Sequence, residues 1–181
     1  MTQPSITKFI RPQGLVWAAV AFLFLGCQKT GLKEREEPMK AAAAKDVGAT
    51  GEFRTWYSGI DPLTLWELQG ARAATAKYKN IENAWRDGYI DIGVILPNMG
   101  YHFMDTAAVD ASIDLRHPEI LVYNKRADGS FYLSAVEYAV PLDLSDTAPE
   151  GFSGSTDVWT HHDGFGLWLL HAWVWQYNRA G

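Results

Sequence analysis

The sequence contains a single cysteine, Cys27, among its 181 residues. One cysteine cannot build a disulfide framework within the chain, and it cannot supply the several thiolates of a cysteine-based zinc site. Basic residues are too few to form a basic face, since 16 Lys and Arg against 21 Asp and Glu leave a formal net charge of −5. Nucleic-acid-binding domains usually carry a basic patch, so we expect no nucleic-acid partner.

Motifs that mark common enzymes are missing from the sequence. It has no GxSxG elbow, no HExxH pair, no EF-hand loop and no Gly-rich phosphate loop. No cysteine follows Cys27 to act as a nucleophile. The acids Asp105, Asp110 and Asp163 fall in predicted loops, where ordinary solvation accounts for them. Enzymatic activity is therefore a weak interpretation, with His102 beside Glu137 as the available base and orienting carboxylate.

The sequence also lacks a hydrophobic run long enough to cross a membrane. Its longest one, residues 15–25, follows Lys8 and Arg11 and falls well short of the ~20 residues of a spanning helix. This pattern indicates a secretory signal, and the "FLGC" that follows resembles a bacterial lipobox with Cys27 as the lipidated residue. Residues 1–27 are thus predicted to be a lipoprotein-type signal peptide.

Lipidation at Cys27 would place the mature protein in the cell envelope, anchored to the outer membrane or facing the periplasm. The membrane would then be its partner. The alternative is a plain signal peptide and a secreted protein. Residues 28–50 are charged, rich in Ala and without an apolar period, which predicts a flexible tether. Residues 51–181 are predicted to form one globular domain.

Within that domain, the strongest helix signals lie between Asp61 and Gly88. Asp61 suits an N-cap, Pro62 the first helical position, and Gly88 a left-handed residue after the end. The spacing predicts that one face of this helix packs on a sheet, formed by Ala74, Tyr78, Ile81 and Trp85.

Strands are predicted over residues 89–96, 119–123, 131–140 and 165–177, although a buried helix is an alternative for the last. Asp128-Gly129 predicts a hairpin between the second and third of these strands. Residues 142–156 suit a long loop. The fold class is therefore α+β, with an antiparallel sheet of about four or five strands packed against one main helix.

Five segments together resemble a family of secreted bacterial proteins and lipoproteins: "ARAATAKYKNIENAWRDGY", "MGYHF", "RHPEILVY", "VEYAVP" and "LHAWVWQYN". In this family an ATAKY-type helix, MGxHY, PExLxY, VEYxVP and LHxWxW follow one another in this order. The resemblance covers roughly residues 71–178 and implies no particular activity. It directs attention to His102, Glu137 and His171. Relatives commonly carry a His soon after the helical Lys-Tyr, where this chain has Lys79 and Asn80.

The same three residues are the best candidates for metal ligands. Alternation along the predicted strands places Glu137 on a face with Leu133, Ala135 and Ala139, and His171 on a face with Leu167, Leu169, Trp173 and Trp175. An ionised Glu on an apolar face costs several kcal/mol unless it is paired or bound to a cation. We expect His102, Glu137 and His171 to hold a divalent transition metal, zinc, copper or iron, with His161 or His162 as a further ligand.

Two alternatives remain open. The His and Glu side chains can form a hydrogen-bonded network without a metal. The protein would then be a binding or interaction module that uses an aromatic-rich surface, since the chain has eight Trp, several of them near its end.

Overall fold

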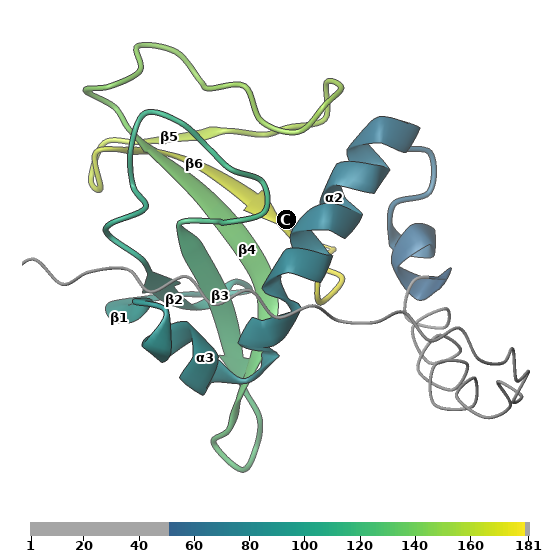
Figure 1. Cartoon of the computed structure of the whole chain (residues 1–181), viewed down its shortest axis with the longest axis vertical. Coiled ribbons are helices and arrows are strands. Elements are labelled where there is room, and N and C mark those ends of the chain that lie inside the picture. The colour runs from purple at the N-terminus through teal and green to yellow at the C-terminus, as the bar shows by residue number, and fades with distance from the viewer. Residues whose placement is uncertain (1–50, 180–181) are drawn as a thin grey trace, which may run out of the picture.

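Residues 51–179 are described by the structure, a computed structural model (Figure 1). Cys27 and the predicted signal peptide and tether lie outside the described residues. Residues 51–56 are helical, and the remaining helices are α2 (Pro62–Thr75), η1, a 3-10 helix (Ala76–Lys79), and α3 (Ile81–Arg86). No helix in this part of the chain is long and apolar enough to cross a membrane.

The strands form one antiparallel sheet in the order β1-β2-β3-β4-β6-β5. Their bounds are β1 Ile90–Leu96, β2 Gly100–Met104, β3 Ile120–Lys125, β4 Phe131–Pro141, β5 Thr160–His162 and β6 Leu167–Ala172. The α+β class is thus confirmed, with six strands instead of four or five. The predicted hairpin is confirmed too, because β3 and β4 pair across a turn in which Gly129 has φ +83°.

The single predicted helix is wrong in its middle. Asp61 does cap α2 by accepting from the backbone of Leu63, and Gly88 has φ +102°. Between them, however, Asn80 adopts extended backbone angles and its side chain accepts from the N–H of Glu82, so that it ends η1 and begins α3. An Asn side chain competes in this way with the helical hydrogen bonds of the main chain.

This break rotates the following residues out of the predicted face. Trp85, expected to pack on the sheet, is 52% exposed, whereas Ala84 is buried. The face of α2 that packs on the sheet is formed by its buried residues Leu68, Ala71 and Thr75. Sequence spacing alone therefore placed the contact face correctly only in part.

Two strands, β2 and β5, were not predicted, and β6 is shorter than the expected strand over 165–177. Strand β5 has three residues, too few for a periodic signal. The alternative of a buried helix near the C-terminus is excluded, since β6 pairs with both β4 and β5.

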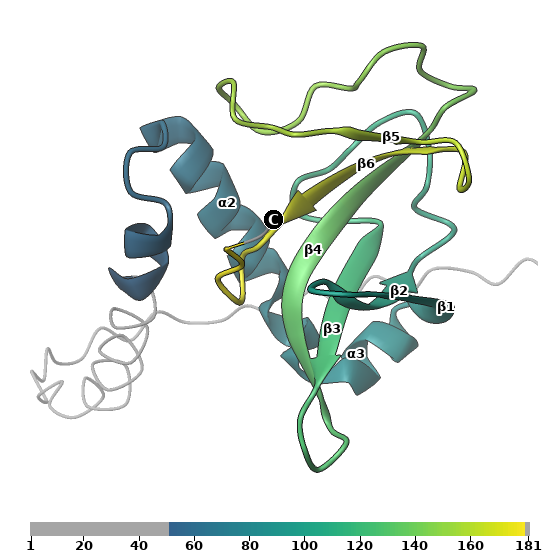
Figure 2. The ribbon, with the colours of Figure 1, turned by 180° about the vertical axis from the view of Figure 1, so that it is seen from behind.

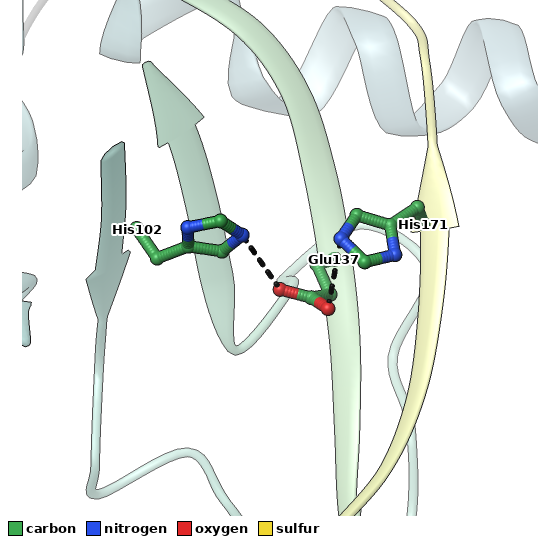
Figure 3. A group of neighbouring side chains, drawn as sticks. All are labelled: His102, Glu137 and His171. Carbon is green, nitrogen blue, oxygen red and sulfur yellow. Dashed lines mark ion pairs between the residues drawn. The ribbon is translucent and has the colours of Figure 1, made fainter. Parts of the chain in front are cut away.

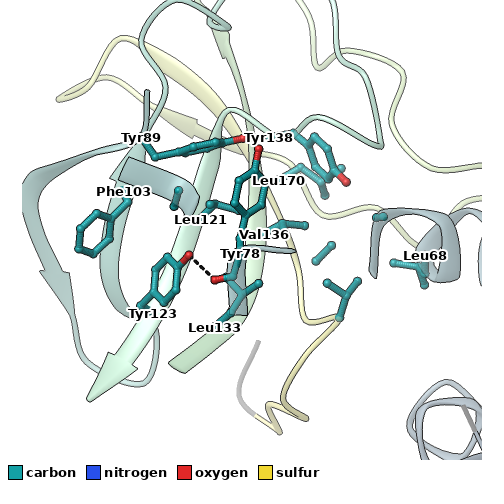
Figure 4. Packing of buried hydrophobic residues seen from close by; sticks show 14 of the residues in the cluster. Leu68, Tyr78, Tyr89, Phe103, Leu121, Tyr123, Leu133, Val136, Tyr138 and Leu170 are labelled. Carbon is teal, nitrogen blue, oxygen red and sulfur yellow. Dashed lines mark hydrogen bonds between the residues drawn. The ribbon is translucent and has the colours of Figure 1, made fainter. Parts of the chain in front are cut away.

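The main core lies between the helices and one face of the sheet (Figure 4). It is rich in aromatic rings that meet edge to face, among them Phe103 with Tyr123. The hydroxyl of Tyr123 donates to the carbonyl oxygen of Tyr78 at 2.7 Å and so ties the 3-10 helix to the sheet. A second buried bond joins the Tyr89 hydroxyl to the carbonyl oxygen of Pro118 at 2.6 Å.

No helix of residues 51–179 covers the other face of the curled sheet, as the view from behind shows (Figure 2). A smaller apolar cluster lies there, formed by Ile120, Val122, Ala135, Ala139, Leu169 and Trp173. Leu133 was expected on this face but belongs to the helix-side core. The β3–β4 register shifts between Val122 and Tyr123, which adds one residue to β4 and reverses the side of Leu133. Trp175 lies beyond the end of β6 and packs against the helix-side core as well.

Candidate metal centre

Three of the predicted ligands meet on the helix-free face of the sheet: His102 from β2, Glu137 from β4 and His171 from β6 (Figure 3). Nε2 of His102 lies 3.6 Å from Oε2 of Glu137. Nε2 of His171 lies 2.9 Å from Oε1 of the same carboxylate. Each residue offers one ligand atom such that all three atoms lie within 4.8 Å of one another.

The sheet pairing explains this convergence. Glu137 and His171 are direct partners in the β4–β6 ladder, so their side chains leave the sheet side by side on one face. His102 comes from β2, which is separated from β4 by β3. Adjacent strands lie about 4.8 Å apart, so a flat sheet would hold the backbones of His102 and Glu137 roughly 10 Å apart. On the concave side of a curled sheet, side chains from such strands converge.

A neighbouring irregularity orients the ring of His102. The β1–β2 register shifts between Asp91 and Ile95, and Val94 lies within this shift. The carbonyl oxygen of Val94 lies 3.2 Å from Nδ1 of His102. A carbonyl only accepts hydrogen bonds, so Nδ1 carries the hydrogen. In the neutral ring, Nε2 therefore presents a lone pair towards Glu137.

Nε2 of His171 is buried as well, and it has no hydrogen-bond partner in the described residues. It is 2.9 Å from the carboxylate of Glu137 but off the direction that a hydrogen bond requires. The side chains of His102 and Glu137 are only 4% and 2% exposed, and that of His171 is 17% exposed. Buried polar groups are normally paired, and a cation between Nε2 of His171 and the carboxylate would supply the missing partner.

The cluster can hold a metal ion. Two imidazoles and one carboxylate are a ligand set common to zinc and iron sites. Tetrahedral bonds of about 2.0–2.2 Å separate ligand atoms by roughly 3.3 Å, and one ligand atom from each residue already lies within 4.8 Å of the other two, so small side-chain movements would close the site on an ion. The bond from His102 to the Val94 carbonyl has the form of the outer contacts that orient metal-bound histidines.

The remaining two predicted histidines lie on opposite faces of β5. His162 shares the side of the cluster, because it pairs with Leu167 in β6. Its Nδ1 accepts the N–H of Phe165 at 3.2 Å, and its ring stacks on Phe165 at 4.1 Å. His161 points to the other face, where its ring meets Trp168 edge to face at 4.8 Å. The structure thus does not bring His161 to the cluster.

A cavity of about 390 Å³ opens directly above the three ligands. The ligand residues His102, Glu137 and His171 share its lining with His162 and Thr160. All other lining residues are apolar: Ile92, Val94, Leu96, Met99, Met104, Ile120, Phe165, Leu167 and Leu169. The contribution of β1 to this wall was not predicted. The sequence of β1 indicates a strand, but it does not show which other residues that strand faces.

A second cavity, of about 510 Å³, lies between α2 and the segment after β6. Aromatic residues line it, among them Trp56, Tyr57 and Trp173. Burial raises the pKa of the Tyr57 hydroxyl to about 12, and the same cause raises the pKa of the lining residue Asp157. His171 contributes to the linings of both cavities.

Sequence reasoning missed one buried acid, Glu119, which is 2% exposed. Its carboxylate accepts the backbone N–H of Ala139 at 3.1 Å, two residues beyond Glu137, which pairs with Ile120 at the end of the β3–β4 ladder. Burial raises the pKa of Glu119 to about 7, and the charges of Asp110 and Asp114 add to the rise. The only sequence signal was its position just before an apolar run.

Comparisons of the chain with protein-family models, with curated proteins and with solved structures give no match. The site itself therefore has to carry the functional argument.

Proposed function

We propose that this protein binds one divalent transition-metal ion through His102, Glu137 and His171. The observation that carries the proposal is the orientation of His102. Its Nδ1 hydrogen is committed to Val94, so in the neutral ring its Nε2 lone pair points at a carboxylate that, when ionised, also only accepts. Two acceptors face each other in a buried site, and a cation between them removes the conflict.

The donor set is compatible with zinc, copper and iron. Met99 and Met104 both line the cavity above the ligands, and soft thioethers favour copper slightly. His162 is less suited to be a further ligand than the sequence suggested. Its Nδ1 accepts from the backbone of Phe165, so its Nε2 carries the hydrogen when the ring is neutral. We assign it the role of a hydrogen-bond donor to whatever occupies the cavity.

Elemental analysis tests the proposal. The chain is purified after export by the cell, without a polyhistidine tag, beside the His102→Ala, His171→Ala and His161→Ala variants. We expect about one metal ion per chain, lost in the first two variants and kept in the third, whose ring lies on the opposite face of the sheet. No metal in the wild type, even after reconstitution with zinc, copper and iron, would overturn the proposal.

We further propose that the protein is exported and anchored to the membrane through lipidated Cys27. The short apolar run over 15–25 and the "FLGC" that follows support this. Growth with a labelled fatty acid tests it, with Cys27→Ser as the control variant. Label in the wild type and none in Cys27→Ser supports the anchor, whereas an unlabelled wild-type chain of reduced mass indicates a plain secretory signal.

A binding module without a metal is the second candidate, and the aromatic cavity beside α2 is the observation that favours it. Such cavities suit small ligands when a few polar groups fix their orientation. Asp157 and the buried indole nitrogen of Trp173, which has no hydrogen-bond partner in the described residues, are available here. Ligand binding that survives treatment with a chelator and fails in Trp56→Ala would favour this function.

A further inference from the structure

The cavity above the three ligands is large enough for an organic molecule and is walled almost entirely by apolar side chains. Its volume of about 390 Å³ lies in the lower part of the ~300–1,000 Å³ range of small-molecule sites. Its wall carries Met, Ile, Val, Leu and Phe side chains. Water gains few hydrogen bonds on such a wall, so the cavity suits a ligand with an apolar body.

The charge of the cavity indicates which polar group the ligand carries in addition to its apolar body. Among residues 51–179, Glu137 is the only Asp, Glu, Lys or Arg in its lining. A divalent ion on this carboxylate and two neutral imidazoles leaves a net charge of about +1. Burying a net charge among apolar walls is costly, and one negative charge on the ligand removes it. Without the metal, the same ligand would meet the negative charge of Glu137 instead.

The direction of the free coordination positions agrees with this charge balance. All three ligand side chains lie on the same face of the sheet, so the sheet itself closes one side of the site (Figure 3). The positions that they leave open face the cavity. In the described part of the chain, His162 and Thr160 are the only other polar side chains of the lining. Both are hydrogen-bond donors, which a second ligand oxygen requires.

We propose that the metal-loaded cavity binds a small organic monocarboxylate, with its carboxylate on the metal and its apolar body against the Leu, Ile and Val side chains of the wall. This inference rests on the proposed metal site. It names the class of ligand which that site takes.

Calorimetry with the full chain loaded with zinc tests the inference. Hexanoate is the probe. Acetate is the comparison compound that carries the carboxylate without the apolar body, and 1-hexanol carries the apolar body without the carboxylate. We expect hexanoate to bind at least about tenfold more tightly than acetate, because burial of its methylene groups adds to the metal contact. Binding of hexanoate should weaken at least about tenfold in the metal-free chain, and 1-hexanol should show no dependence on the metal.

A matched pair of variants locates the binding. Leu96 lines the cavity, and its neighbour Ile95 is 57% exposed and does not line it. Leu96→Asp adds a negative charge to the wall and should weaken hexanoate at least about tenfold, whereas Ile95→Asp should change it less than about twofold. Zinc content should be unchanged in both, since neither residue is a ligand.

The outcomes separate the two proposals. A chain that takes up zinc but binds hexanoate no more tightly than acetate, or equally well without zinc, overturns the monocarboxylate inference and leaves the metal site standing. Equal weakening in both Asp variants also overturns it. A chain that takes up no zinc, copper or iron overturns the metal site, and the inference falls with it.

Discussion

Nε2 of His102 lies 3.6 Å from Oε2 of Glu137, and in the neutral ring both atoms are hydrogen-bond acceptors. Both side chains are almost fully buried, at 4% and 2% exposed. With a neutral ring and an ionised carboxylate, the contact is unfavourable in the metal-free protein and becomes favourable when a cation bridges the two atoms. This difference separates a metal site from a purely structural His–Glu network.

The Glu137→Gln variant tests this difference through the stability of the protein with and without zinc. The Gln amide can donate a hydrogen to Nε2 of His102, so the variant without metal should be at least as stable as the metal-free wild type. Zinc at about 100 times its Kd should stabilise the wild type by about 2.7 kcal/mol and raise its Tm by roughly 10 °C, but it should not shift the variant. Thermal unfolding with zinc and with a chelator gives both values.

The opposite pattern would identify a structural network. In that case the wild type melts at the same temperature with zinc and with chelator, and Glu137→Gln is destabilised under both conditions. His171→Gln serves as the control for the loss of a metal ligand. It removes one ligand, as Glu137→Gln does, but it keeps Glu137 and places a polar side chain next to it in the β4–β6 ladder.

The buried bond from the Tyr123 hydroxyl to the Tyr78 carbonyl should contribute measurably to stability. Tyr123→Phe removes the donor and leaves that carbonyl without this partner, so we expect the free energy of unfolding to fall by about 1–2 kcal/mol. Tyr132→Phe is the control, because the Tyr132 hydroxyl has no hydrogen-bond partner among residues 51–179, and its effect should stay within about 0.5 kcal/mol. Urea unfolding at constant m-value measures both; equal effects would show that the bond is not a net contributor.

Sequence patterns predicted the features of this fold that depend on a few adjacent residues. They did not predict the features that depend on how the strands pair with one another. The Asp61 cap and the Asp128-Gly129 turn are determined by a few adjacent residues, and both are confirmed. The side on which Leu133 lies depends on a shift in the β3–β4 register, which no local pattern marks. The three-residue β5 is likewise defined by its partner β6.

The candidate site follows the same rule. His102, Glu137 and His171 stood out because charged or polar residues interrupt apolar stretches, and the structure brings them together. His161 and His162 are adjacent in sequence, so only the register of β5 against β6 decides which of them faces the site. The backbone carbonyl of Val94, which orients His102, has no signal in the sequence.

Glu119 should make the stability of the protein depend on pH. Its pKa is about 7 in the folded state against an ordinary value of 4.5, so the folded protein holds this proton more tightly. The associated stability is fully present below about pH 4.5 and is lost as pH rises through about 7. The free energy of unfolding should fall by up to about 3 kcal/mol over this window because of this one group.

Glu119→Gln isolates that contribution. The Gln carbonyl can still accept the N–H of Ala139 but cannot ionise, so the variant should gain stability relative to the wild type at about pH 8 and not at about pH 5. Urea unfolding at both pH values gives the comparison. A difference between variant and wild type that does not change with pH would show that Glu119 does not titrate in this window.

Gly100 and Gly70 should respond in opposite directions to the same substitution. Gly100 begins β2 with φ +130°, and a Cβ there would overlap the carbonyl oxygen of Tyr123. Gly70 lies inside α2, and the nearest atom to a Cβ there is the Arg116 guanidinium at 3.9 Å. Gly100→Ala should therefore cost more than about 2 kcal/mol, whereas Gly70→Ala should stabilise by about 0.5–1 kcal/mol through helix propensity.

The Gly100 substitution also connects the fold to the site. His102 is two residues further along β2 and reaches Glu137 only while β2 keeps its register against β3. Relaxing the overlap with Tyr123 has to move β2, so Gly100→Ala should lower zinc content at a temperature where the protein is still folded, and Gly70→Ala should not. Circular dichroism and elemental analysis of the same samples test this. Full zinc content in a folded Gly100→Ala protein would show that the three ligands tolerate a displaced β2.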